Sequence, residues 1–290
     1  METDFRRFSI SILIVLLLGL LPVCSDSLAG SASLKSQMVK MRDGVHLSTN
    51  VYFEGEVKKG RPSILIRTVY NKNYVFGWNP VWEKLVSQGY AIVIQDIRGR
   101  YESEGSYQIA RGRREDGWDT LEWILNQPWA NGKVGLGGCS YQGETQIVLE
   151  ATNHPSLVVG QPQSAASGYY SPGRAWQSFS GGAFELGQTA GWFAGEGTNV
   201  FYGPNLTGES RSDWFNDKRS HNYKMRPDFD FNKYLKNIKT LPTISLLSRS
   251  GATPNNFDLW RANTPDGDYF RSMDLVDAND RISVPNLFFD

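Results

Sequence analysis

The sequence predicts an α/β fold in which helices alternate with the strands of a mostly parallel sheet. Two continuous apolar runs, at residues 63–69 and 90–95, are typical of strands that are buried on both faces. Amphipathic segments at residues 81–88 and 116–126 predict helices, and a third apolar stretch begins at residue 134. This alternating order of strands and helices indicates a parallel sheet with right-handed crossovers.

Further segments complete the predicted organisation. Residues 38–52 alternate around an Arg-Asp-Gly turn and predict a hairpin at the start of a core that spans residues 30–163. Residues 164–280 are rich in Gly, Ser and aromatic side chains, and we expect a mainly helical cap or insertion there. Its aromatic residues would either roof an apolar pocket or pack the helices together. Residues 281–290 predict a return strand to the core.

Charge and composition exclude some classes of partner. The chain has 290 residues, with 30 basic and 30 acidic side chains, so its formal net charge is zero. Nothing in this balance favours nucleic acid or an acidic membrane surface as a partner. Aromatic residues make up 13% of the chain, which is enough for a sizeable core.

The N-terminus has the pattern of a targeting segment. Two arginines precede an apolar run at residues 9–21, which is short for a membrane span. We therefore predict a signal peptide at residues 1–29, cleavage after Ala29, and export to the periplasm or the exterior, with no stable membrane span afterwards. A lipoprotein processed at Cys24 and an uncleaved anchor are the alternatives.

The sequence shows no sign of a metal or a cofactor. After cleavage Cys139 would be the only cysteine, so no disulfide could form within the mature chain. The three histidines, His46, His154 and His221, are far apart in the sequence and do not have the spacing of metal ligands. His46 lies on the predicted hairpin, where a surface or cross-strand position is the expected one.

A glycine-rich turn around Ser140 is the candidate reactive centre. An apolar run leads into Gly137–Gly143 and a helical pattern follows it, which predicts a strand, a sharp turn and a helix. Such an elbow would expose the Ser140 hydroxyl and leave the backbone N–H of Tyr141 at a helix N-terminus, where it can bind an oxyanion. The usual pattern is Gly-x-Ser-x-Gly, and here the second glycine comes one residue late. An ordinary strand-to-helix connection with a capping serine is the alternative.

Several ordered motifs carry a family resemblance over about residues 38–166. They are Met41-Arg42-Asp43-Gly44-Val45, Arg67-Thr68-Val69-Tyr70, Asp96-Ile97-Arg98-Gly99-Arg100, Glu115-Asp116-Gly117-Trp118-Asp119 and Gly138-Cys139-Ser140-Tyr141-Gln142-Gly143. Together they resemble the serine hydrolase family of X-prolyl dipeptidyl peptidases, cocaine esterase, α-amino acid ester hydrolases and glutaryl acylases. The resemblance implies an α/β-hydrolase fold with an inserted helical cap, and the family's Gly-x-Ser-Tyr-x-Gly pattern accounts for the late glycine.

The resemblance also implies a role for individual residues. Ser140 would be the nucleophile that forms an acyl-enzyme. The backbone N–H of Tyr141 and the phenol of Tyr70 would be the two oxyanion donors. The substrate would be a small ester or amide or a short peptide, cleaved at an acyl or X-Pro dipeptidyl bond. For Tyr70, simple packing at a strand end is the alternative.

Other residues of these motifs have structural interpretations. We expect Asp96 and Arg98 to pin the loop after the second parallel strand by a charge-assisted hydrogen bond. Trp118 and Trp123 are expected in the core. Glu144, at the start of the helix after the elbow, is expected to act as a partner of the helix dipole.

A serine nucleophile needs a histidine and an acid, and neither is evident in this chain. His154 follows Ser140 by fourteen residues, which places it at the far end of the elbow helix. His221 lies in the predicted cap, and Asp290 falls about four positions before the family's aspartate. We therefore expect the front part of a longer hydrolase, truncated before the end of the sheet. The alternative is a genuinely short product that is catalytically inactive or only binds a ligand. The sequence leaves the substrate and the oligomeric state open.

Overall fold

The fold described here comes from a computed structural model. It describes residues 33–56, 60–107, 114–165, 184–195, 230–242, 245–251, 256–263, 267–277 and 279–287. The predicted signal segment, His221 and Asp290 lie outside these ranges.

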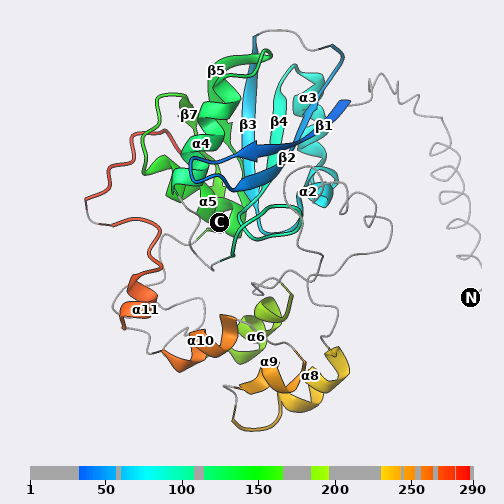
Figure 1. The fold of residues 1–290 in the computed structure, drawn as a ribbon, viewed down its shortest axis with the longest axis vertical. Coiled ribbons are helices and arrows are strands. Elements are labelled where there is room, and N and C mark those ends of the chain that lie inside the picture. Colours follow the sequence, from blue (N-terminus) through cyan, green and yellow to red (C-terminus); the bar gives the residue numbers. More distant parts are fainter. Residues whose placement is uncertain are drawn as a thin grey trace, which may run out of the picture. The chain divides into compact units, whose positions relative to one another are not determined.

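The core is a six-stranded sheet in the order β1-β2-β4-β3-β5-β7 (Figure 1). Its strands are β1 (Ser33–Lys40), β2 (His46–Phe53), β3 (Arg61–Thr68), β4 (Ala91–Asp96), β5 (Ala130–Leu136) and β7 (Leu157–Val159). The pairs β1–β2 and β2–β4 are antiparallel, whereas β4–β3, β3–β5 and β5–β7 are parallel. The predicted hairpin and the mostly parallel sheet are therefore confirmed, although β1 begins earlier than residue 38.

Helices cover both faces of this sheet around its central strand β4, which is buried on both sides. Ile92 and Ile94 of β4 pack with α2 (Lys72–Trp78) and α3 (Pro80–Ser87). The alternate residues, Ala91 and Val93, pack on the opposite face with α4 (Arg114–Leu125) and α5 (Tyr141–Glu150). The continuous apolar pattern of β4 is thus explained by burial on two faces.

One helix of the core lacks a strong sequence signal. Helix α2 is short, and its start depends on Asn71, whose side-chain oxygen accepts the N–H of Asn73. Asn71 has a positive φ of 76°, an uncommon conformation outside glycine that asparagine tolerates better than most residues. The turn that carries Tyr70 therefore leads directly into a capped helix.

The segment predicted as a cap is helical where the structure describes it. Its helices are α6 (Leu186–Gly195), α8 (Phe231–Asn237), α9 (Leu246–Arg249), α10 (Asn256–Ala262) and α11 (Asp268–Arg271). They bury an aromatic cluster that includes Phe193, Phe257 and Trp260, and Tyr141 and Ile147 of the elbow helix belong to the same cluster. This segment therefore packs on the elbow helix through apolar side chains.

Residues 279–287 run beside the open edge of the sheet. Gly160 and Asn286 form a parallel bridge, and the backbone N–H of Leu287 donates to the carbonyl of Gly160 at 3.0 Å. Asp280 pairs with Arg114 of α4. The sequence predicts a return strand over residues 281–290; among the described residues, this segment forms one isolated bridge with Gly160 and no strand.

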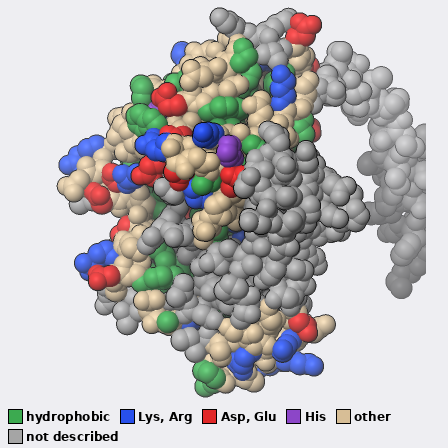
Figure 2. All heavy atoms as spheres, viewed as in Figure 1, with side chains coloured by type: hydrophobic (Ala, Val, Ile, Leu, Met, Phe, Trp, Pro, Cys, Tyr) green, Lys and Arg blue, Asp and Glu red, His purple; other side chains and the backbone are tan. Residues whose placement is uncertain are grey.

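The surface of the described part agrees with the neutral charge balance. Figure 2 shows acidic and basic side chains interspersed on the visible face of the molecule. No helix in the described ranges is both long enough and apolar enough to cross a membrane.

Candidate active site

Ser140 occupies a strained elbow between a short strand and a helix. The two-residue strand β6 (Gly138–Cys139) pairs in parallel with β8 (Pro162–Gln163), and α5 begins at Tyr141. Ser140 has φ 60° and ψ −126°, a conformation that a residue with a side chain rarely adopts. Its N–H donates to the carbonyl of Gln163 at 2.9 Å, and its carbonyl accepts the N–H of Gly143 at 2.8 Å. The Ser140 side chain does not cap the helix.

Close packing explains the two glycines that flank the serine. Gly138 has φ 125°, and a Cβ there would lie 2.5 Å from the Cβ of Gln142. A Cβ at Gly143 would lie 2.7 Å from the Cβ of Ala165 and 2.9 Å from the carbonyl oxygen of Gln163. The second glycine is needed at position 143 because this is where α5 passes the chain that follows β8.

Tyr70 reaches Ser140 from the end of β3. The Tyr70 hydroxyl lies 3.1 Å from Ser140 Oγ, within hydrogen-bond distance. As the first residue of α5, Tyr141 has a backbone N–H without an acceptor inside the helix. The structure thus brings together the three groups that the sequence singled out.

The phenol of Tyr70 has several hydrogen-bond partners, and its hydroxyl donates to Ser140 Oγ. Burial raises the pKa of the phenol, while its hydrogen bonds with Ser140, with the backbone of Tyr141 and with Trp192 of α6 oppose that rise. The phenol therefore stays a neutral donor at physiological pH. The Tyr141 N–H, the Tyr70 hydroxyl and Ser140 Oγ therefore lie close together at the elbow.

Comparison with known proteins identifies the family. The family model described as X-Pro dipeptidyl-peptidase (S15 family) matches residues 43–287. The chain belongs to this family.

The proteins that are similar to this chain include an esterase, by sequence, and two solved structures, by fold. Cocaine esterase of Rhodococcus sp. (strain MB1 Bresler) is 38% identical over 169 residues, which cover 56% of this chain and 28% of the esterase. An aminopeptidase from the marine sediment archaeon Thaumarchaeota archaeon aligns with 90% of this chain and 43% of its own, at 21% identity and a TM-score of 0.65. The structure of an α-amino acid ester hydrolase aligns with 92% of this chain and 43% of its own, at 24% identity and a TM-score of 0.58. The α/β-hydrolase fold is therefore shown, and this family member spans less than a third of the length of the esterase.

The two described histidines of this family member lie in other networks. His154 is buried, and its ring nitrogens contact Glu122 at 2.9 Å and the hydroxyl of Ser156 at 2.8 Å. His46 lies on β2 and pairs with Glu104 at 3.0 Å. Neither histidine lies within hydrogen-bond distance of Ser140, and for His154 this is the expected arrangement. His221 and Asp290 are outside the described residues.

The loop after β4 departs from the expected arrangement. Arg98 makes its charge-assisted hydrogen bonds with Asp116 of α4, at 2.6 Å and 3.0 Å, and also pairs with Asp43. Asp96 instead accepts the backbone N–H of Lys72 at 2.8 Å. Both residues hold the loop, but with separate partners, because Asp96 points toward the turn after Tyr70 and Arg98 points toward α4.

The remaining residues with structural interpretations are half-buried or buried. Trp118 packs edge-on against His154, and Trp123 packs against Trp129. Glu144 lies in the first turn of α5 and is buried. Burial raises the pKa of the phenol of Tyr141, and the charge of Glu144 raises it further.

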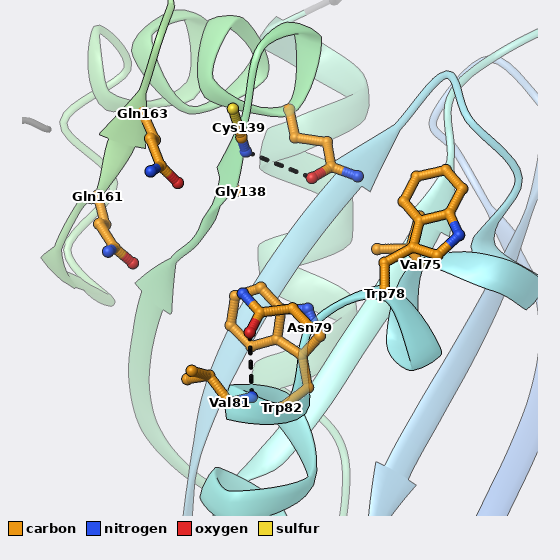
Figure 3. Close-up of a pocket in the computed structure, with 10 residues that line it drawn as sticks. Val75, Trp78, Asn79, Val81, Trp82, Gly138, Cys139, Gln161 and Gln163 are labelled. Atoms are coloured by element: carbon orange, nitrogen blue, oxygen red, sulfur yellow. Dashed lines mark hydrogen bonds between the residues drawn. The ribbon is translucent and has the colours of Figure 1, made fainter. Parts of the chain in front are cut away.

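A small hollow lies beside the elbow on the side of α3. It has a volume of about 210 Å³ and is lined by the rings of Trp78 and Trp82 on one side and by Cys139, Gln161 and Gln163 on the other (Figure 3). Cys139 is exposed there and directly precedes Ser140. In the described part of the chain, no group of three or more His, Cys, Asp or Glu side chains is arranged to hold a metal ion.

Sequence reasoning missed two side chains of the site. Trp192 of α6 approaches the phenol of Tyr70 and stacks on the ring of Tyr141, with centroids 6.4 Å apart. Gln142 donates to Thr68 Oγ1 at 3.1 Å and links the elbow helix to β3. The only signal for Trp192 was the aromatic composition of the predicted cap, and Gln142 gave none.

Proposed function

We propose that this chain is a serine hydrolase that cleaves ester or amide bonds in small molecules or short peptides through an acyl-enzyme on Ser140. The observation that carries the proposal is the 3.1 Å contact between the Tyr70 hydroxyl and Ser140 Oγ at a strained elbow. A backbone held in a costly conformation at a concave site is a common property of catalytic centres. The sequence similarity to an esterase supports the same reaction class.

The proposed reaction uses groups that are already aligned. Ser140 Oγ attacks the carbonyl carbon of the substrate, and its proton passes to a base. The carbonyl oxygen becomes an oxyanion, which the Tyr70 hydroxyl and the Tyr141 N–H stabilise. Collapse of the intermediate expels the alcohol or amine and leaves the acyl group on Ser140, and water then releases the acid.

The base and the acid of the proposed triad come from residues that the structure does not describe. Both described histidines are engaged elsewhere, His46 with Glu104 and His154 with Glu122. His221 and Asp290 are candidates within this chain. The rest of the family fold, of which this chain covers only part, is the other source.

The partners of the two described histidines also support a second candidate function, that of a non-catalytic binding protein. Because His46 and His154 bond to Glu104 and Glu122 and not to Ser140, the alternative is a protein that binds a ligand without hydrolysing it. Such a protein would keep the pocket and the oxyanion donors but would lack a base for the serine.

A fluorophosphonate probe separates the two functions. We expect residues 30–290 to be labelled once per chain, as read by intact mass, because the oxyanion donors stabilise the phosphonyl oxygen. Ser140→Ala should abolish labelling, whereas Cys139→Ala, which removes the exposed neighbouring thiol, should leave it intact. Labelling that persists in Ser140→Ala would contradict Ser140 as the nucleophile. An unlabelled but folded wild-type chain would favour the non-catalytic function.

We further propose that residues 1–29 direct export and are then removed. The basic residues followed by a short apolar run support this proposal. Intact mass of protein recovered from an expressing cell's exterior or periplasm should correspond to a chain that begins at Gly30. A chain that retains residue 1, or one that begins at a lipid-modified Cys24, would contradict it.

A further inference from the structure

Two buried side chains hold the turn that presents Tyr70, one at the end of β4 and one in the loop that follows it. Before Tyr70, the carbonyl of Val69 accepts a hydrogen bond from Arg100 Nε at 3.2 Å. After Tyr70, the backbone N–H of Lys72 donates to Asp96 Oδ1 at 2.8 Å. Asp96 and Arg100 are both fully buried; Asp96 is the last residue of β4, and Arg100 lies in the loop that follows it. The end of β4 and the loop after it therefore hold the backbone on either side of the tyrosine.

The centre of the same turn is tied to the elbow helix. The backbone N–H of Tyr70 donates to Thr68 Oγ1 at 3.0 Å, and Gln142 Nε2 donates to the same oxygen at 3.1 Å. Because Gln142 lies two residues after Ser140, this hydroxyl couples the backbone of the turn to the helix that carries the nucleophile. The positive φ of Asn71 is maintained by these surrounding bonds.

These hydrogen bonds to the backbone of the turn matter because the Tyr70 side chain is only partly buried. Its ring is not enclosed as tightly as a core residue, so the position of the hydroxyl depends on the backbone of the turn. A displacement of about 1 Å in a group that acts on the transition state can reduce a rate by about a hundredfold. A turn that is free to shift would therefore weaken the contact with the developing oxyanion.

We propose that Asp96 and Arg100 are positioning residues for the oxyanion donor Tyr70. They act by holding the Lys72 N–H and the Val69 carbonyl, so that the phenol stays at its place beside Ser140. This inference rests on the proposed function for the role of Tyr70 in catalysis. The geometry of the turn stands independently of it.

The hydrogen bonding of the two Asp96 carboxyl oxygens shows what the turn requires of this side chain. Its second oxygen, Oδ2, has no hydrogen-bond partner among the described residues. The turn therefore requires one acceptor at Oδ1 and not a pair of carboxylate oxygens. A carboxamide supplies the same acceptor with nearly the same shape, so Asp96→Asn should preserve the position of Tyr70, whereas Asp96→Ala should not.

The experiment uses the chain of residues 30–290 and two readouts. The first is the kinetics of fluorophosphonate labelling of Ser140, resolved into the affinity for the probe and the maximal labelling rate. The second is the NMR signal of the ring carbon that bears the hydroxyl of Tyr70, in protein with labelled tyrosine, assigned with Tyr70→Phe. Asp116→Ala serves as the matched control. It removes the α4 carboxylate that binds Arg98 of the loop after β4, but it removes none of the hydrogen bonds to the turn.

For Asp96→Ala we expect a maximal labelling rate about tenfold below wild type at unchanged probe affinity, since the transition state is affected more than binding. The Tyr70 signal should move. Asp96→Asn and Asp116→Ala should stay within about twofold of wild type and leave the Tyr70 signal in place. If Asp96→Ala fails to fold, Arg100→Met carries the same test, because it removes the donor to Val69 at the other end of the turn.

The two readouts separate the two possible failures. Wild-type labelling rates and an unmoved Tyr70 signal in Asp96→Ala, or in Arg100→Met if that variant is used, would overturn the positioning role. An equal loss of rate in Asp96→Asn and Asp116→Ala would also overturn it, because it would show a general effect of instability. If the folded wild-type chain is not labelled at all, the proposed function fails, and the Tyr70 signal alone decides whether Asp96 positions the tyrosine.

Discussion

At the scale of single residues, the proposed reaction depends on two tyrosines that would contribute through different groups. Tyr70 offers its phenol, 3.1 Å from Ser140 Oγ, while Tyr141 offers its backbone N–H and buries its ring against Trp192. Burial raises the pKa of both phenols, which keeps the Tyr70 proton available for donation. Mutation can therefore separate the two contributions. Replacing Tyr70 by phenylalanine removes its hydroxyl, whereas the N–H of Tyr141 belongs to the backbone and remains.

Removing the Tyr70 hydroxyl tests its contribution directly. We expect Tyr70→Phe to lower the rate of fluorophosphonate labelling by about 10²-fold or more, the usual loss for one oxyanion donor. The ring remains, so the fold should be retained, as read by circular dichroism. Tyr74→Phe is the matched control, because Tyr74 is exposed on α2. Equal rates for Tyr70→Phe and wild type would mean that the phenol does not act on the oxyanion.

A second residue-scale test concerns the buried ion pair below the Tyr70 turn. Lys72 Nζ and Glu102 lie 3.0 Å apart and are both almost completely inaccessible. Burial alone would raise the pKa of Glu102, but Lys72 and the hydrogen bonds from Asn73 and Ser48 bring it below its ordinary value. Glu102 is thus held in its charged form by its partners.

We expect Lys72→Met to lower the free energy of unfolding by about 3–5 kcal/mol, because it removes the ammonium group that lies 3.0 Å from a buried carboxylate. Adding Glu102→Gln to the same chain should recover much of the loss. Urea denaturation of the single and double variants measures both effects. The exposed Lys84→Met serves as the control, and a loss in Lys72→Met no larger than this control would show that the pair does not stabilise the fold.

At the scale of elements, the loop after β4 connects the sheet to α4 and to the Tyr70 turn. Arg98 ties it to α4 through Asp116, and Asp96 ties it to the turn. Its path requires Gly99, which has φ 72° and lies against the backbone of Tyr107, 2.1 Å from where a Cβ would be. This loop therefore links the sheet and α4 to the turn that carries Tyr70.

Gly99→Ala should therefore be strongly destabilising, because the neighbouring atom is backbone and cannot move aside like a side chain. We expect a loss of more than about 2 kcal/mol in the free energy of unfolding, from strain and overpacking together. Gly77→Ala is the matched control, since a Cβ on this exposed helical glycine would meet nothing within 4 Å. Its substitution should be neutral or stabilising by up to about 1 kcal/mol. Equal stability of the two variants, measured by urea denaturation, would contradict the predicted close approach.

At the scale of the whole molecule, the buried carboxyl of Asp96 should influence stability as a function of pH. Burial, together with the charge of Glu102, outweighs the attraction of Lys72 and Arg100 and raises the pKa of Asp96 from 3.8 to about 7. The folded state then holds this proton more tightly than the unfolded state. The contribution is fully present below about pH 4 and is lost as the pH rises toward about 7.

We therefore expect the free energy of unfolding of the wild-type chain to fall between about pH 4.5 and pH 7 relative to that of Asp96→Asn, which carries no titrating carboxyl. Urea midpoints of the two chains across this window provide the measurement. Glu102 does not interfere, because its lowered pKa puts its own transition at more acidic pH. Parallel curves for the two chains would show that Asp96 does not hold its proton in the folded state.

The sequence by itself determined the series of strands and helices and the candidate groups of the site. Apolar runs such as that of β4 report burial on two faces, and this property is local in the chain. The elbow at Ser140 and the tyrosine at the end of β3 followed from their positions in ordered motifs. Their identity as candidates therefore needed no knowledge of tertiary contacts.

Tertiary structure decided which side chains meet. Tyr70 and Ser140 are seventy residues apart, and their contact depends on the parallel pairing of β3 with β5. The separate partners of Asp96 and Arg98, and the approach of Trp192 to the phenol, likewise depend on how distant elements pack. Periodicity reports which face of an element is buried, but the direction of a side chain toward a distant partner is set by register and topology, and only the folded chain specifies these.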